Sequence, residues 1–267
     1  MSGQEPAAIW FCGDTHGRFE HLRRAVDLHR PKSVILLGDV QSSRPLEQEL
    51  GELVEERTEV WFIHGNHDTD TEADYDHLLD SALAHRNLHG RVVEVAGMRI
   101  VGLGGIFRGR VWQPPQPAHY ESPEEFCLRS GHGSRWRGGL PLRMRSTIFP
   151  SEWYALAEQS AELLVTYEAP DVHPHGFAAI TELAQLMGVG RSFHGHHHDR
   201  LDYAAAFDRI GFKAFGVGLP GICDLDGRVV AAGEMDAERR SRLSVPPESM
   251  WCEGHDSASA AVGAKSL

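Results

Sequence analysis

The sequence is poor in cysteine, in long apolar runs and in net positive charge, and each shortage excludes a class of protein. Only four cysteines occur in 267 residues, and none form a CxxC pair, which excludes a zinc ribbon and a dense disulfide framework. No apolar run approaches the roughly 18 residues of a membrane-spanning helix. The first residues, MSGQEPAA, lack the basic and apolar segments of a signal peptide. We therefore expect a cytoplasmic protein with reduced cysteines and no membrane contact.

Basic residues are also in the minority. Lys and Arg total 26 against 38 Asp and Glu, a formal net charge of −12, which argues against a wholly basic nucleic-acid-binding surface. The 41% hydrophobic and 24% charged residues are typical of a globular protein and exclude a disordered one. Histidine is abundant, with 17 copies. An acidic chain rich in histidine and poor in cysteine favours a metal site built from nitrogen and oxygen ligands.

The first hundred residues alternate between strand-like and helix-like segments. Apolar runs at Ala8–Cys12, Ser33–Leu37 and Glu59–Ile63 predict strands, and the stretches Arg18–His29 and Pro45–Glu56 predict helices. This alternation indicates βαβ units and a mainly parallel sheet. Polar residues follow each predicted strand, and ligands of such sheets bind beyond the carboxyl ends of the strands. We therefore expect one composite site at that edge.

The rest of the chain predicts a further set of elements. Arg91–Val95 and Met98–Leu103 indicate a hairpin around Ala96 and Gly97, and alternation over 203–231 suggests consecutive antiparallel strands. Residues 1–242 are expected to form one domain with an insertion at about 106–147, and residues 243–267 a flexible tail. Between these lie predicted helices at Ser151–Leu163 and Phe177–Met187 and predicted strands at Leu163–Tyr167 and Arg191–Phe193.

Polar side chains at the predicted strand ends form a set of candidate metal ligands. Carboxylates, imidazoles and an amide suit ions such as Mn, Fe or Zn. A carboxylate such as Asp39 can bridge two ions through its two oxygens, and two ions about 3.5–4 Å apart can activate water and neutralise a phosphoryl group. The candidates are Asp14, His16, Asp39, Asn66, His67, Tyr167, His196 and His198.

Four motifs in a fixed order carry a specific resemblance. GDTHG at 13–17, GDV at 38–40, GNHD at 65–68 and GHHH at 195–198 resemble the motif series of the calcineurin-like metallophosphoesterase superfamily. The resemblance implies an α/β fold of four αββα layers, in which two mixed β-sheets are flanked by helices. It also implies hydrolysis of phosphate monoesters or diesters by a metal-activated water at a dinuclear site. Two metal ions are expected, Mn first, with Fe and Zn as alternatives.

The resemblance also implies roles for single residues. One ion would be held by Asp14, His16, Asp39 and His198, and the second by Asp39, Asn66, His196 and the residue at position 167. His67 resembles the residue that contacts phosphate and protonates the leaving group, and Asp68 the residue that orients it. Asn66 and His67 are accordingly expected to contact the substrate.

Position 167 departs from this pattern, because Tyr167 stands where the family carries a metal-binding histidine. Three interpretations compete: Tyr167 ligates as a phenolate, it leaves the second ion weakly held, or it is an engineered change that lowers activity. Neutral phenol is a poor ligand, with an ordinary pKa near 10. The alternative function is therefore a metal- and phosphate-binding scaffold of weak or lost activity. His173 and His175 follow closely and either replace the missing ligand or lie behind the site.

Two further features bear on the substrate. GDV is followed by QSSR, whereas protein Ser/Thr phosphatases carry DRG, so the resemblance favours a phosphodiesterase, nuclease-like or small-molecule phosphatase branch. The insertion carries seven arginines against three glutamates, with aromatic residues between them. One hypothesis is a lid in which Arg108, Arg135 and Arg137 bind a phosphate ester, a nucleotide or a nucleic acid. The other is an arginine-rich loop that packs on an acidic body or on a subunit partner. The sequence does not indicate an oligomeric state.

Overall fold

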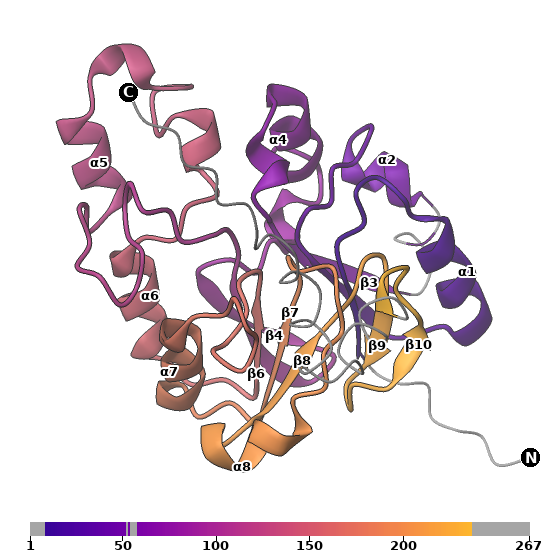
Figure 1. The fold of residues 1–267 in the computed structure, drawn as a ribbon. Helices are drawn as coiled ribbons and strands as arrows, with labels where there is room; N and C mark the ends of the chain where they lie inside the picture. The colour runs from indigo at the N-terminus through magenta and orange to yellow at the C-terminus, as the bar shows by residue number, and fades with distance from the viewer. Residues whose placement is uncertain (1–8, 52, 54–57, 237–267) are drawn as a thin grey trace, which may run out of the picture.

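Two β-sheets packed face to face form the centre of the protein. The structure, a computed structural model, describes residues 9–51, 53 and 58–236, so the predicted tail at 243–267 lies outside the described residues. Within the described ranges, the first sheet has five strands in the order β10-β9-β1-β2-β3 (Figure 1). Strands β1, β2 and β3 are parallel, whereas β9 runs antiparallel to β1 and β10. Their bounds are β1 Ile9–Cys12, β2 Ser33–Leu37, β3 Glu59–Ile63, β9 Ile222–Asp224 and β10 Val229–Ala231.

The second sheet also has five strands in the part of the chain that is described, in the order β4-β5-β6-β7-β8. The predicted hairpin is confirmed, because β4 pairs antiparallel with β5. Its turn residues have φ of 48° at Ala96 and 84° at Gly97, as two-residue hairpin turns require. The other neighbours are parallel. The bounds are β4 Arg91–Val95, β5 Met98–Leu103, β6 Leu163–Thr166, β7 Arg191–His194 and β8 Lys213–Gly216.

Helices cover the outer face of each sheet, so the predicted four-layer α/β sandwich with two mixed sheets is confirmed (Figure 1). The first sheet is covered by α1 (Glu20–His29), α2 (Leu46–Leu50) and α4 (Glu72–Leu79). The second is covered by α6 (Pro150–Ala157), α7 (Ala178–Leu186) and α8 (Phe207–Ile210). Short 3-10 turns complete this part: η1 His67–Thr69, η2 Ala84–Arg86 and η5 Ala204–Ala206. Among the described residues, none of the helices is long and apolar enough to cross a membrane.

The central strands β1, β2 and β6 are buried along their whole length because each sheet is covered on both sides. Along β1, Ile9 and Phe11 point to the core between the sheets, whereas Trp10 and Cys12 pack toward the outer helices. Phe11 stacks on Phe193 of β7, with ring centroids 3.6 Å apart. This contact across the sandwich holds the ends of β1 and β7 close together, which positions the loops that follow them.

Two element predictions were wrong in part. Of residues 203–231, β9 and β10 are consecutive antiparallel strands as predicted, but β8 joins the second sheet parallel to β7, and Ala204–Ile210 is helical. Alternation marks strands but carries no information about which sheet they join. The helix predicted over Ser151–Leu163 ends at Ala157, since Leu163 already belongs to β6.

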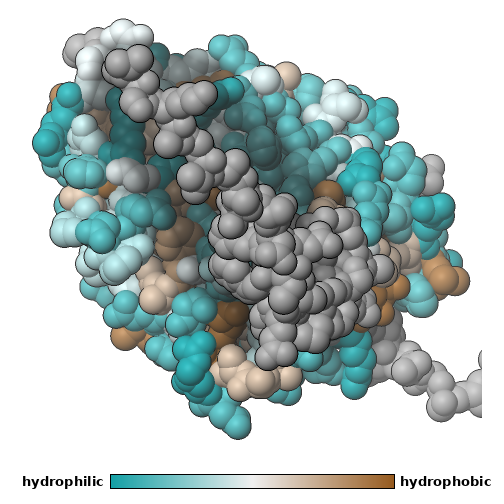
Figure 2. Space-filling model, in the orientation of Figure 1, coloured by the Kyte–Doolittle hydropathy of each residue, from teal (hydrophilic) through white to brown (hydrophobic). Residues whose placement is uncertain are grey.

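The insertion packs around a small core of its own. It contains α5 (Pro123–Arg129) and the 3-10 turns η3 (His132–Ser134) and η4 (Leu142–Met144). Phe126 and Met144 pack with Val111 and Phe149 in this core. In Figure 1, α5 stands at the upper left, apart from α4. Figure 2 shows the surface hollowed and largely hydrophilic between the regions over these two helices.

Candidate metal centre

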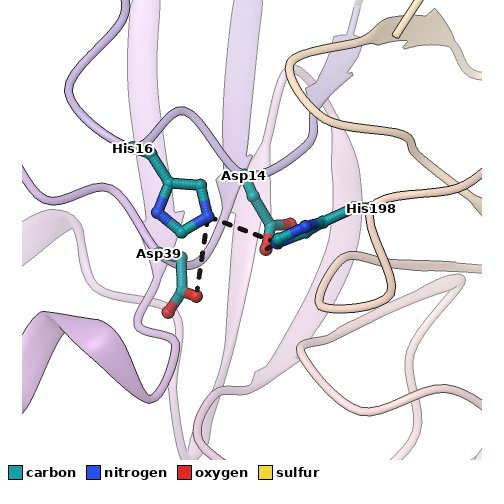
Figure 3. A group of neighbouring side chains, drawn as sticks. All are labelled: Asp14, His16, Asp39 and His198. Atoms are coloured by element: carbon teal, nitrogen blue, oxygen red, sulfur yellow. Dashed lines mark hydrogen bonds and ion pairs between the residues drawn. The ribbon is translucent and has the colours of Figure 1, made fainter. Parts of the chain in front are cut away.

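Four side chains from three loops converge beyond the carboxyl ends of β1, β2 and β7. Asp14 and His16 follow β1, Asp39 follows β2, and His198 follows β7. One ligand atom from each lies within 4.8 Å of the other three, and Figure 3 shows their imidazoles and carboxylates facing one space. The Nε2 atoms of His16 and His198 are 3.3 Å apart, as expected for two ligands that each lie about 2.1 Å from one ion. The structure thus brings together all four residues expected at the first metal.

The ring of His16 is oriented by a residue that the motifs do not include. Its Nδ1 lies 2.5 Å from Oε1 of Gln41. An amide oxygen only accepts hydrogen bonds, so Nδ1 carries the hydrogen and the lone pair of Nε2 is left for an ion. A hydrogen-bonded partner of this kind is typical of metal-binding histidines.

Both carboxylates are buried and fixed by backbone donors. The N–H of His196 donates to Oδ1 of Asp14 at 3.0 Å, and that of His67 donates to Oδ1 of Asp39 at 2.9 Å. The Oδ2 atoms of both carboxylates lie on the side of the histidines, at 3.4 Å from Nε2 of His198 for Asp14 and at 4.0 Å from Nε2 of His16 for Asp39. Burial, followed by the negative charge of Asp14, raises the pKa of Asp39. Two buried carboxylates repel each other, and a bound cation is what makes both negative charges favourable.

Several residues of the centre hold a left-handed backbone. Non-glycine residues rarely adopt positive φ, at a cost of about 1–3 kcal/mol each, and such residues cluster at functional sites. Here the sharp turns after the strands bring ligands from adjacent loops into one space. The values are 44° at His16, 44° at Asp39, 43° at Gln41, 71° at His196 and 59° at His198.

The residues assigned to a second ion follow the carboxyl ends of one strand from each sheet. Asn66 follows β3 and His196 follows β7. Oδ1 of Asn66 is buried and has no hydrogen-bond partner within the described ranges, as fits an oxygen that ligates a cation. Burial lowers the pKa of His196, which favours the neutral imidazole that binds metals. These donors fit a second ion beside Asp39.

Tyr167 occupies the fourth position of this second set and is completely buried. Its hydroxyl donates to Oδ2 of Asp14 at 3.3 Å and lies near the carboxylate of Asp39. The ring lies against Gly38 and Gly65, where a Cβ atom would collide with it. Burial, followed by the charges of Asp14 and Asp39, raises the pKa of Tyr167 well above its ordinary value. The geometry therefore favours a protonated donor to the carboxylates over a phenolate ligand.

His67 has a different partner from the one that the resemblance implies. Asp68 is fully buried, and its two oxygens accept the backbone N–H groups of Gln41 and Gly65 at 2.9 and 2.8 Å. Nδ1 of His67 lies 2.6 Å from Oδ2 of Asp70. The orienting contact predicted for Asp68 thus comes from Asp70, because Asp68 is directed inward to join two loops.

Two of the arginines expected to bind substrate serve the packing of the insertion. Arg137 forms a bidentate pair with Asp76 of α4, at 2.6 and 2.9 Å, and Arg135 donates to the carbonyl of Cys127. The neighbouring Trp136 donates to Glu72 of α4 at 2.8 Å. These contacts engage both guanidinium groups, and they support the alternative in which the arginine-rich segment packs on acidic residues of the body.

Arg108 is placed differently. Its side chain is partly buried, and its Nη2 donates to Oγ of Ser146 at 3.3 Å. Its Nε has no hydrogen-bond partner in the described part of the chain. Burial lowers its pKa, while the nearby carboxylates of Asp70 and Glu168 act in the opposite direction. Arg108 therefore lies beside the partner of His67, and its Nε is a buried donor without a partner among the described residues.

The hydrogen bonds of His173 exclude it as the replacement ligand. Its Nδ1 accepts the backbone N–H of His175 at 3.0 Å, so its hydrogen is on Nε2, which lies 3.5 Å from Asp199. The ring stacks on His197 with centroids 3.8 Å apart. His197 therefore packs between His173 and the ring of His196.

Sequence reasoning missed three residues of this region: Gln41, Asp70 and Glu168. Each stands within three residues of a motif residue, but its role depends on the folding of its loop. Glu168 follows Tyr167 directly, and its Oε2 lies 4.0 Å from Nε2 of His196. Burial raises the pKa of Glu168 to about 7, so a second titratable carboxyl group borders the centre.

The model of the calcineurin-like phosphoesterase family matches residues 7–200. A protein of Haemophilus influenzae, described as uncharacterized, is 40% identical over 231 residues, which cover 86% of this chain and 100% of that protein. The crystal structure of TT1561 of Thermus thermophilus is similar with a TM-score of 0.49 and 12% identity, covering 84% of this chain and 98% of that one.

Proposed function

Because this chain belongs to the calcineurin-like phosphoesterases, a family of metal-dependent phosphoester hydrolases, we propose that it hydrolyses small phosphate esters at a dinuclear centre. The observation that carries the proposal is the convergence of Asp14, His16, Asp39 and His198 within 4.8 Å. Asn66 and His196 complete the centre toward a second ion. Nitrogen and oxygen donors together suit Mn²⁺, which we propose as the working metal, ahead of Fe and Zn.

Each residue of the centre has a separate role in the proposed reaction. The buried Asp14 and Asp39 would hold the cations, which when bound would supply an activated water and neutralise charge on the phosphoryl group. The Gln41 contact keeps His16 in the tautomer that binds metal. His67 donates a proton to the oxygen of the leaving group. Arg108, with its spare donor, binds a phosphate oxygen of the substrate.

The substrate class follows from the placement of the insertion. A nuclease-like enzyme would need free arginines and aromatic rings along a strand of nucleic acid. Trp136 and Arg137 are an adjacent aromatic residue and arginine of the insertion, but their side chains are hydrogen-bonded to Glu72 and Asp76 of α4. We therefore favour small phosphate esters, nucleotides included, as substrates.

Hydrolysis of p-nitrophenyl phosphate and bis-p-nitrophenyl phosphate with added Mn²⁺ tests the proposal. We expect turnover that a chelator abolishes and Mn²⁺ restores. Asp39→Asn should lose metal and activity together, since Asp39 is the residue that would hold both ions. Absence of hydrolysis of either ester with Mn²⁺, Fe²⁺ or Zn²⁺, in protein shown by metal analysis to hold two ions, would overturn the enzyme hypothesis.

Tyr167 supports a second candidate function, a metal- and phosphate-binding scaffold with little catalysis. The phenol donates to Asp14 and replaces a ligand of the second ion. On this hypothesis the wild-type chain binds inorganic phosphate in the presence of Mn²⁺, measured by calorimetry, without turning over either ester. Activity in the wild-type chain rejects it.

A further inference from the structure

Asp70 makes the shortest polar contact of His67. Its Oδ2 lies 2.6 Å from Nδ1 of the imidazole, and the two residues sit at either end of the 3-10 turn η1, where the N–H of Asp70 bonds to the carbonyl of His67 at 3.2 Å. The geometry of the turn places both side chains on one side. A carboxylate accepts hydrogen bonds, so Nδ1 of His67 carries the hydrogen.

This contact determines which ring nitrogen faces the centre. The Nε2 of His67 lies 4.0 Å from Oδ2 of Asp39. With Nδ1 committed to Asp70, Nε2 is the nitrogen that can exchange a proton with a substrate oxygen beside the ions. A rotation of the ring that broke the contact with Asp70 would turn Nε2 away from Asp39.

The insertion in turn holds Asp70. Nε of Arg143, on η4, lies 3.5 Å from Oδ1 of Asp70. The guanidinium of Arg108 is a second cation beside this carboxylate. Arg143 is 75% exposed, so its pair with Asp70 contributes little to stability. Its effect is on where the carboxylate points, since each oxygen of Asp70 has a separate partner.

The two other carboxylates near His67, those of Asp68 and Asp39, have different hydrogen-bond partners. Both oxygens of Asp68 are engaged by backbone N–H groups, and Oδ1 of Asp39 accepts the backbone N–H of His67 itself. Asp70 is one-third exposed, so it borders the open side of the centre, where a leaving group departs.

From these contacts we infer that Asp70 is a positioning residue for His67, held in place from the insertion by Arg143. The inference rests on the proposed function, in which His67 protonates the leaving oxygen. Asp70 does not touch the reacting atoms. It keeps the hydrogen on Nδ1 and directs Nε2 to the substrate, in the way that outer partners orient histidines at metal centres.

The kinetic test compares two esters with different leaving groups. Phenyl phosphate needs protonation of its leaving oxygen more than p-nitrophenyl phosphate does. Asp70→Ala should lower kcat for phenyl phosphate by about 10-fold or more and change that for p-nitrophenyl phosphate by less than about 2-fold, with KM unchanged. Asp70→Asn, which keeps an acceptor oxygen, should fall between wild type and Asp70→Ala. Asp76→Asn removes a carboxylate that also binds an insertion arginine, and serves as the matched control with no effect.

A double-mutant cycle separates positioning from general damage. If Asp70 acts through His67, then Asp70→Ala should cause no further loss in a His67→Asn background. An equal loss in both backgrounds would overturn the inference, because it would show that Asp70 contributes independently of the ring.

A nuclear magnetic resonance measurement tests the contact between Asp70 and His67 without measuring activity. In ¹⁵N-histidine-labelled, Zn²⁺-loaded protein, the ring nitrogens of His67 are identified by their loss in His67→Asn. Their shifts should indicate a protonated Nδ1 in wild type and change in Asp70→Ala but not in Asp76→Asn. Unchanged His67 shifts in Asp70→Ala would overturn the inference. If no ester is hydrolysed, the proposed function fails. The ¹⁵N chemical shifts of His67 still test whether Asp70 orients the ring.

Discussion

The hydroxyl of Tyr167 lies 3.3 Å from Oδ2 of Asp14, so a phenol donates a hydrogen bond to a carboxylate of the metal centre. In the proposed dinuclear centre, this side chain stands where the resemblance implies a metal ligand. The contact also connects the end of β6 to the loop after β1 across the core between the sheets. We therefore expect the affinity for a second ion to depend on residue 167.

Tyr167→His should increase the affinity for the second ion, because an imidazole nitrogen then joins Asp39, Asn66 and His196. We expect metal analysis after dialysis to rise from about one ion per chain to about two, and hydrolysis with Mn²⁺ to rise about 10-fold or more. Tyr167→Phe is the control, since it keeps the ring and removes the hydroxyl without adding a ligand. A wild-type chain that retains two ions after the same dialysis would contradict this prediction.

Gln41→Ala should weaken binding of the first ion. The substitution removes the acceptor for Nδ1 of His16, so the ring loses both its fixed orientation and its preferred tautomer. Metal affinity should fall about 10- to 100-fold, measured by competition with a chelating dye. Gln48→Ala, on the exposed face of α2, should leave the affinity unchanged. An equal effect of the two substitutions would show that the contact with His16 is not the cause.

Arg108→Ala and Arg137→Ala should differ in kinetics although both remove an arginine of the insertion. Arg108 keeps a donor beside the centre, so its loss should raise KM about 10-fold, in proportion to one charged hydrogen bond. Arg137 is bound to Asp76, so its loss should leave KM within about 2-fold. The measurement is initial rate against concentration of p-nitrophenyl phosphate. A larger rise in KM for Arg137→Ala than for Arg108→Ala would contradict this prediction and support the hypothesis that the insertion is a substrate-binding lid.

Stability should fall as pH rises through the titration range of Glu168. Burial raises the pKa of this carboxyl to about 7 from an ordinary 4.5. The unfolded chain therefore releases the proton first. The contribution of Glu168 is fully present below pH 4.5 and is lost as pH rises through 7, by roughly 3 kcal/mol at most.

Glu168→Gln should remove this part of the pH dependence, because the amide stays neutral and its oxygen can still accept the N–H of Phe107, which Glu168 accepts at 3.0 Å. We expect the variant to be more stable than wild type at pH 8 and similar at pH 4, in urea unfolding of metal-free protein. Glu158→Gln, at an exposed position, is the control. A wild-type chain whose free energy of unfolding does not decrease between pH 5 and pH 8 relative to the variant would contradict the prediction.

Much of the fold and the first metal set could be predicted because both depend on local patterns. The strands Ser33–Leu37 and Glu59–Ile63 have the predicted bounds, since fully buried strands read as continuous apolar runs. Asp14, His16, Asp39 and His198 were expected together because the four ordered motifs resemble those of the family. The assignment of β8 to the second sheet and of β9 to the first could not be predicted, because their alternation is the same in either sheet.

The motif residues and the strand pattern were thus sufficient for the family, the four layers and the identity of the first ligands. The partners of those ligands came from packing between segments far apart in the chain. Gln41 reaches His16 across 25 residues, and Tyr167 reaches Asp14 across 153. The pairing of Asp70, rather than Asp68, with His67 depends on how one 3-10 turn directs its side chains. Hydrogen bonds of this kind depend on the three-dimensional geometry of the loops. Local sequence patterns do not predict that geometry.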